Sequence, residues 1–171
     1  MPQSVIVIDA TIGGVSTNSY LSLADFELLI HQRPFHSAWD KINDDDVKKA
    51  ALIWGTTILS NLQYKGAPTS STQKLPWPRT GIYDYDGREY DSDSYPDWFI
   101  TAFVEVVFNA AINNTLSDTG LEGISELKIG PISIKTDPSD RPDIIPGYIL
   151  ENIKFWLKGG YKSISVSLVR V

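Results

Sequence analysis

Residues 94–108, SYPDWFITAFVEVVF, decide the fold class of this chain. Ser94, Pro96 and Asp97 give this stretch a capping side chain, an early proline and an acid, which are typical of the first turn of a helix. The residues that follow are apolar on nearly every side, and such a helix belongs in the interior of a bundle. We therefore predict that this segment forms the central helix of the core.

Three further helices are predicted around this central one. The first spans about residues 22–32, because Ser22 can cap its start and Pro34 lies just past its end. The second opens at residues 44–46, three aspartates that suit the positive end of a helix dipole. The fourth spans about residues 145–158, directly before a pair of glycines. The apolar stripe predicted for the second helix comprises Val47, Ala50, Ala51, Trp54, Ile58 and Leu62.

Short β elements are predicted in the connections between the helices. The pair Asp86-Gly87, flanked by tyrosine-rich segments, is a strong hairpin signal. Apolar residues also alternate on both sides of Gly130-Pro131, and residues 164–171 form a β-prone tail. The predicted fold class is therefore mainly α, with a small four-helix core, long loops, short β-hairpins and an extended β-prone C-terminal tail.

One domain accounts for most of the chain, because 171 residues are enough to bury a single core of ordinary size. We predict a single helical domain over residues 1–160, with the loop 64–94 inserted between helices. Residues 161–171 are predicted to form an extended C-terminal arm. Long loops in a compact domain are usually functional, so we expect these segments to reach outward.

The loop contains the segment Leu75-Pro76-Trp77-Pro78-Arg79, in which two prolines enclose a tryptophan. A residue that precedes proline is driven to an extended conformation, so the segment is a stiff arm. Trp and Arg dominate protein–protein contact energies, which favours a docking surface. The equally open alternative is a loop that packs its tryptophan on the core of its own chain. Further interface residues are predicted in the tail, whose β-type side chains could pair with a neighbouring chain. They are Tyr161, Ile164, Val166 and Leu168.

Composition excludes several classes of function. The chain has 15 basic and 21 acidic residues, a net charge of −6 and no cysteine. Disulfides and thiolate chemistry are therefore excluded, and binding that relies on clustered cations is disfavoured. No apolar stretch is long enough to cross a membrane, and the N-terminus lacks the pattern of a signal peptide. We expect a soluble, intracellular protein where it is made.

Motifs for catalysis or metal binding are not found. The sequence has neither a phosphate-binding P-loop nor a nucleophile elbow. His31 and His36 lie on either side of Pro34 and share no helix face, so we expect surface polar residues and not a catalytic or ligand pair. The acidic residues after Asp84 fail the calcium-loop spacing. We therefore predict no enzyme activity, no cofactor and no metal site.

Single-stranded nucleic acid binding is the alternative that combines aromatic and basic residues. Lys74, Trp77 and Arg79 form such a cluster, and Tyr64-Lys65 lies upstream. The loop that follows is acidic, which disfavours contact with phosphates.

The order of these motifs resembles the head–tail adaptors, or connectors, of tailed bacteriophages, a family often labelled DnaT-like single-stranded DNA-binding. The similarity extends from about residue 18 to residue 158. The most specific part of the similarity runs from residues 70–73 to the Trp-Pro-Arg segment. The other matching motifs are at residues 18–25, 49–53, 86–87 and 128–132. The resemblance implies a mainly helical subunit without catalytic residues, about twelve of which would form a ring.

The same resemblance implies the partners and location of the chain. They are further copies of itself, the portal protein, a tail or neck protein and the packaged double-stranded DNA that passes through the channel, at the head–tail junction of the virion, with assembly in the host cytoplasm. A negatively charged ring would not adhere to sliding DNA. The alternative function is a replication-type single-stranded DNA-binding protein.

Overall fold

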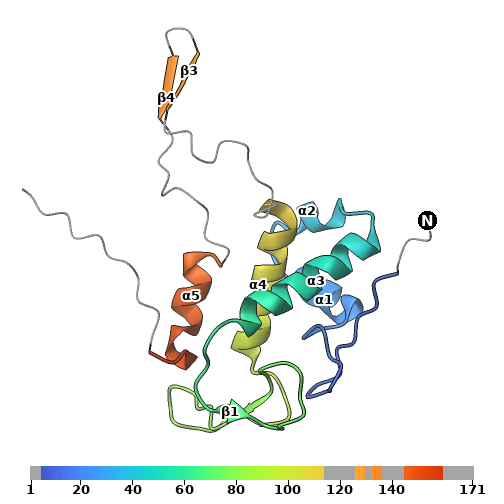
Figure 1. Ribbon diagram of the computed structural model, residues 1–171, viewed down its shortest axis with the longest axis vertical. Helices are drawn as coiled ribbons and strands as arrows, with labels where there is room; N and C mark the ends of the chain where they lie inside the picture. Colours follow the sequence, from blue (N-terminus) through green and yellow to red (C-terminus); the bar gives the residue numbers. More distant parts are fainter. Residues whose placement is uncertain (1–4, 114–125, 130–131, 136–144, 160–171) are drawn as a thin grey trace, which may run out of the picture.

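A computed structural model describes residues 5–113, 126–129, 132–135 and 145–159. It is mainly helical, as predicted (Figure 1). The helices are α1 (Leu23–Ile30), α2 (Ser37–Asp40), α3 (Asp45–Ser60), α4 (Asp97–Asn113) and α5 (Gly147–Ile153), and α5 continues as the 3-10 turn η1 (Lys154–Trp156). The strands are β1 (Ala67–Pro68), β2 (Arg79–Thr80), β3 (Glu126–Ile129) and β4 (Ile132–Lys135). Among the described residues, no helix combines the length and apolarity needed to cross a membrane.

Helix α4 is the centre of the core, which confirms the prediction from residues 94–108. It contacts α1, α2, α3 and α5 (Figure 1). Phe99, Phe103, Val106 and Val107 are buried between these helices, whereas Thr101 remains exposed. The two helices approach closely at Gly55 of α3, where an added Cβ would lie 2.4 Å from Cγ2 of Val107. Glycine at this position lets α3 pack directly on α4.

The starts of α1 and α3 follow the capping signals in the sequence, whereas α4 begins at Asp97, too far from Ser94 for the predicted cap. The Ser22 hydroxyl accepts a hydrogen bond from the Asp25 N–H at 3.1 Å, and the Asp44 carboxylate accepts one from the Asp46 N–H at 2.9 Å. Helix α2 was not predicted. The stripe predicted for α3 was partly wrong, since Val47 and Ala50 are exposed while Leu52, Thr56 and Leu59 are buried.

The last helix ends earlier than predicted. Regular α-helix stops at Ile153, and Leu157 is extended because it pairs with Tyr64 in an isolated antiparallel bridge. The Lys65 N–H donates to the Trp156 carbonyl at 2.8 Å, and the Lys158 N–H donates to the Gln63 carbonyl at 2.8 Å. The start of the long loop is thus fastened to the end of α5.

Both predicted β-turn regions are found. Asp84–Arg88 forms a tight turn in which Gly87 has a φ of 80°, and Tyr83 pairs with Glu89. Strands β3 and β4 pair antiparallel, with Ile129 opposite Ile132. They contact no other described helix or strand. The short β1–β2 pair was not predicted. The predicted arm at residues 161–171 lies outside the described residues.

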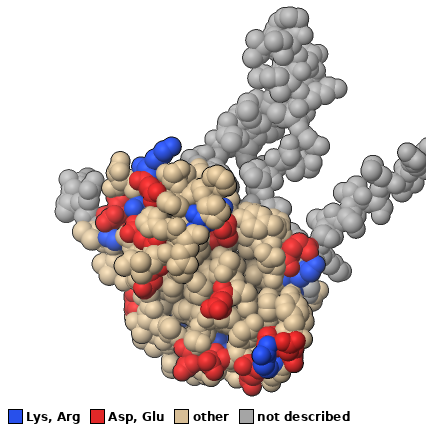
Figure 2. All heavy atoms as spheres, turned by 180° about the vertical axis from the view of Figure 1, so that it is seen from behind, with Lys and Arg blue, Asp and Glu red and all other residues tan. Residues whose placement is uncertain are grey.

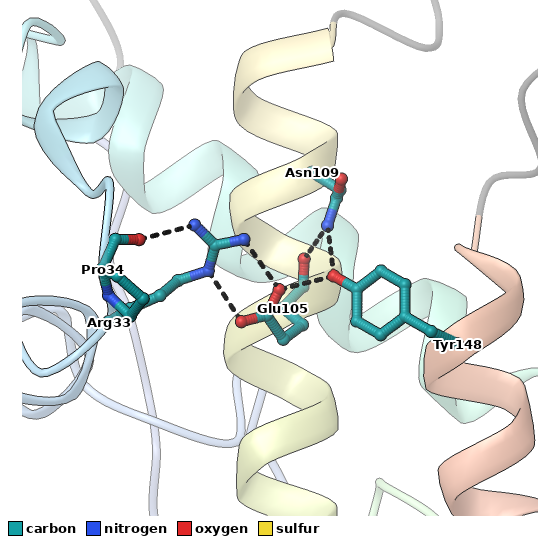
Figure 3. A network of polar contacts seen from close by, with 5 residues as sticks. All are labelled: Arg33, Pro34, Glu105, Asn109 and Tyr148. Carbon is teal, nitrogen blue, oxygen red and sulfur yellow. Dashed lines mark hydrogen bonds and ion pairs between the residues drawn. The ribbon is translucent and has the colours of Figure 1, made fainter.

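A polar network ties the segment after α1 to α4 and α5 (Figure 3). The Arg33 guanidinium donates two hydrogen bonds to the Glu105 carboxylate, at 2.7 and 3.1 Å. The Tyr148 hydroxyl donates to the same carboxylate at 2.6 Å, and the Asn109 amide donates to the Glu105 carbonyl at 2.8 Å. Burial raises the pKa of Glu105, but the hydrogen bonds from Arg33 and Tyr148 outweigh it and lower that pKa overall.

Candidate functional site

Trp77 of the predicted docking arm packs on the core of its own chain. Its side chain is 1% exposed, and its ring centroid lies 5.3 Å from Tyr64, 5.4 Å from Trp98 and 4.6 Å from Phe99. This is the second of the two arrangements that the sequence left open. The pocket that Trp77 fills is therefore formed by this chain, and the ring offers no surface for stacking or docking.

Arg79 is also used within the chain and is only 7% exposed. Its guanidinium donates to the carbonyls of Lys65 at 2.8 Å, Pro76 at 2.9 Å and Gly66 at 2.9 Å. Burial lowers the pKa of Arg79, and these carbonyls supply the hydrogen bonds that water would otherwise give. Arg79 holds the two ends of the loop together, so its donors are not directed at a partner carboxylate.

The rest of the predicted segment is only partly accessible. Pro78 is buried, whereas Leu75 and Pro76 are half-buried and line a shallow surface hollow with Ser60 and Lys74. An interface role for Leu75 and Pro76 stays a prediction. The predicted tail residues Tyr161, Ile164, Val166 and Leu168 lie outside the described residues.

A different surface does combine exposed aromatic rings with basic groups. We call it the aromatic patch: Tyr85, Phe155, Lys65 and Lys158. The Tyr85 ring is 70% exposed and packs on the 37%-exposed Phe155 with 4.4 Å between centroids and 36° between the planes. Nζ of Lys65 lies 4.5 Å from the centroid of Phe155, a cation–π contact. Lys158 is exposed, and the backbone bond to Gln63 places it beside this loop.

The core fixes the aromatic patch from below. Trp156, next to Phe155, stacks on Trp98 of α4 with 4.1 Å between centroids and 4° between planes. Its indole N–H donates to the Tyr83 carbonyl at 2.8 Å, which holds the acidic turn against η1. The two exposed rings thus rest on rigid elements.

Several cations on the described surface are neutralised by acids of the same chain, and Figure 2 shows blue and red groups lying side by side on one face. The described ion pairs of lysine and arginine are Arg33–Glu105, Lys48–Glu27, Lys49–Asp46, Lys154–Glu151, and Arg88 with Asp84 and Asp86. The N–H and guanidinium of Arg88 hydrogen-bond to Asp84 and lower its pKa. Lys65 and Lys158 form no ion pair with any described residue, so their charges are available to an anion; the same holds for the exposed Lys41 and Lys74, which are not part of the aromatic patch.

The sequence analysis does not predict the aromatic patch, although some of its residues stand out in the sequence. The sequence places Lys65 beside Tyr64, and Tyr85 directly before the predicted Asp86-Gly87 turn. Phe155 was counted as part of a helix. The segment 154–158, KFWLK, places two aromatic residues between two lysines and could have been recognised as a candidate.

The structure brings the two histidines together, although they share no helix face. Nε2 of His31 lies 3.0 Å from Oδ1 of Asp40, and Nδ1 of His36 lies 2.9 Å from Oδ2 of the same carboxylate. Hydrogen bonds from His31 and then His36 lower the pKa of Asp40. The sequence interpretation treated these histidines as separate surface residues.

Comparison with known families identifies one match over almost the whole chain. Residues 4–171 match a family described as "Putative DnaT-like ssDNA binding protein". Neither the curated proteins nor the solved structures gave a match. The family match supports the DnaT-like part of the predicted resemblance and gives no support to the head–tail adaptor part.

Proposed function

This chain belongs to the DnaT-like ssDNA-binding family, and from that membership we propose that it binds single-stranded DNA through the aromatic patch. The observation that carries the proposal is the contact of Tyr85 with Phe155, two exposed rings that have an unpaired lysine directly over one of them. Proteins that bind single strands without sequence preference combine these two elements, stacking rings and nearby cations.

The bases would stack on the Tyr85 and Phe155 rings, while Lys65 and Lys158 would contact flanking phosphates. Stacking contributes about 1–3 kcal/mol per base when measured by alanine substitution. Each phosphate neutralised on a single strand adds about −0.7 to the slope of log K against log salt. Two lysines therefore predict a slope of log K against log salt of about −1.4. The remaining binding free energy comes from base stacking, which added salt does not weaken. The proposal needs no catalytic step and no cofactor.

The net charge of −6 means that the protein as a whole repels the negatively charged DNA. Long-range repulsion slows the approach of DNA, because the field of the whole protein acts beyond the contacting residues. The acids nearest the patch, Asp84 and Asp86, are paired with Arg88 and so present less free charge to a phosphate. The attraction between protein and DNA must therefore come from short-range stacking and from the two unpaired lysines of the aromatic patch, Lys65 and Lys158.

The test is fluorescence anisotropy of labelled oligothymidine with wild-type protein, Tyr85→Ala and Phe155→Ala. The matched control is Tyr83→Ala, because Tyr83 is exposed in the same loop but has no ring contact among the described residues. Both patch variants should weaken binding about 5- to 100-fold, and the control should not. Equal affinity for all four proteins would remove the aromatic patch from the proposal.

We keep the head–tail adaptor of a tailed phage as the second candidate function, because a fixed segment at the N-terminus exposes apolar side chains. The Asn18 amide donates to the Val7 carbonyl at 2.8 Å and its oxygen accepts from the Asp9 N–H at 2.8 Å, so the backbone is held in place. Val7 and Val15 nevertheless lie exposed, as do Val5 and Ile12. Exposed apolar side chains on a rigid segment favour contact with another subunit, here in a ring joined to portal and neck proteins.

Purified phage particles distinguish this second candidate from the first. Mass spectrometry of particles should find about twelve copies of the chain if it forms a symmetric ring at the neck. Val7→Asp, which places a charge on the exposed segment, should then prevent ring assembly without unfolding the subunit. Detection in infected cells but never in particles would refute the adaptor candidate.

A further inference from the structure

The side chains of His31, His36 and Asp40 converge on one point of the surface. The three ligand atoms, one imidazole nitrogen from each histidine and one carboxylate oxygen of Asp40, all lie within 4.8 Å of one another. Both imidazoles face the same carboxylate, at 3.0 and 2.9 Å, and their rings lie 5.0 Å apart. These are the only two histidines in the chain.

The local fold forces this convergence. His31 follows the last residue of α1, while His36 and Asp40 lie one helical turn apart on the same side of α2. Between them the chain reverses at Phe35, a non-glycine residue with a φ of 62° and a side chain that is 89% exposed. Such a backbone conformation is costly for a bulky residue, so the rest of the corner must hold it.

The spacing of the three side chains suits a small divalent metal ion. Zinc bonds of about 2.0–2.1 Å to nitrogen and oxygen place neighbouring ligands about 3.3 Å apart in a tetrahedron. The two nitrogens contact different oxygens of Asp40, Oδ1 at 3.0 Å and Oδ2 at 2.9 Å, so side-chain rotations that bring one of these oxygens within reach of both nitrogens would admit the ion. Imidazole with a carboxylate is a ligand set for zinc and its neighbours, whereas magnesium and calcium prefer oxygen ligands alone.

We propose that His31, His36 and Asp40 bind one zinc ion, with the fourth position open to solvent. All three ligands are partly exposed, so an ion can enter directly from water. Bound zinc would join the end of α1 to α2 and thereby stiffen the corner between them, which contains Arg33 and Pro34. This role is separate from DNA binding, because none of the three residues belongs to the aromatic patch.

The experiment is isothermal titration of tag-free protein with zinc chloride, together with NMR of the imidazole protons. A chain with two histidines and no cysteine gives two readily assigned imidazole signals and no competing thiolate. We expect one zinc per chain and a simultaneous shift of both histidine signals. Binding should weaken in acid, because protons compete with the metal for its ligands.

The variants His31→Gln, His36→Gln and Asp40→Asn should each weaken zinc binding at least tenfold. Asp91→Asn is the matched control, since Asp91 is an exposed carboxylate outside the cluster. Circular dichroism of each metal-free variant verifies that the helices remain. Absence of binding to wild-type protein, binding that persists without both histidines, or a shift of one histidine signal alone would overturn the proposal.

Discussion

Tyr85 of the acidic turn packs on Phe155 of η1, with 4.4 Å between ring centroids. The contact joins two distant segments at the surface, and the stacked pair Trp98 and Trp156 supports it from within the core. Because Lys65 lies over Phe155 as well, the loop that follows α3 takes part in the same surface. Three segments thus contribute to the aromatic patch.

Replacement of Trp77 by alanine should strongly destabilise the fold. Deleting a fully buried tryptophan removes apolar contacts with Tyr64, Trp98 and Phe99 and leaves a cavity, at a cost of about 3–5 kcal/mol. Urea unfolding followed by circular dichroism measures this free energy. The variant Trp77→Phe, which removes less of the side chain, should lose less stability. A loss below about 1 kcal/mol would show that Trp77 is not part of the core.

Arg79→Lys should be nearly as harmful as Arg79→Met, because a single ammonium group cannot donate to all the carbonyls that the guanidinium contacts. Leaving buried carbonyls unpaired costs about 1–3 kcal/mol each. We expect both variants to lower the urea midpoint. Full stability of the lysine variant would contradict the fastening role of Arg79.

Gly55→Ala should destabilise the protein although alanine favours helix. The added Cβ would meet Cγ2 of Val107 at 2.4 Å, and overpacking of this kind costs about 1–3 kcal/mol, against a helix gain of about 1 kcal/mol. The double variant Gly55→Ala, Val107→Ala removes the clash and should recover stability relative to Val107→Ala alone. Thermal unfolding of the four proteins completes this double-mutant cycle.

Helix starts and the central helix were predictable, because capping residues such as Ser22 and Asp44 act on their own neighbours. The burial of Trp77 was not decided by sequence, since two prolines fix an extended segment but not the surface that it contacts. The contact of His31 with His36 depends on the positive φ of Phe35. The sequence does not predict that conformation, because phenylalanine does not favour it. The aromatic patch depends on contacts between distant segments, so local patterns could not locate it.

The Arg33–Glu105 pair predicts a pH dependence of stability. Burial raises the pKa of Glu105, but the hydrogen bonds from Arg33 and Tyr148 lower it further, so the folded pKa lies below the ordinary value. A lowered carboxyl pKa stabilises the fold above the unfolded pKa of about 4.3, and that contribution disappears as the pH falls through the folded pKa.

Glu105→Gln should therefore be less stable than wild type at pH 7, by about 1–3 kcal/mol, because charge-assisted hydrogen bonds are lost. The difference between the two proteins should shrink as the pH falls below about 4.3. Urea unfolding at a series of pH values measures it. A difference that stays constant from neutral to acid pH would contradict the assigned shift.

The most direct test of the DNA-binding claim is the anisotropy of a labelled oligothymidine of about 16 nucleotides, long enough for a single-strand site, titrated with purified protein. We predict saturable binding that Tyr85→Ala and Phe155→Ala weaken about 5- to 100-fold while Tyr83→Ala leaves it unchanged. The slope of log K against log salt should be about −1.4. No binding by the wild-type chain at low salt would contradict the claim and leave the adaptor as the leading candidate.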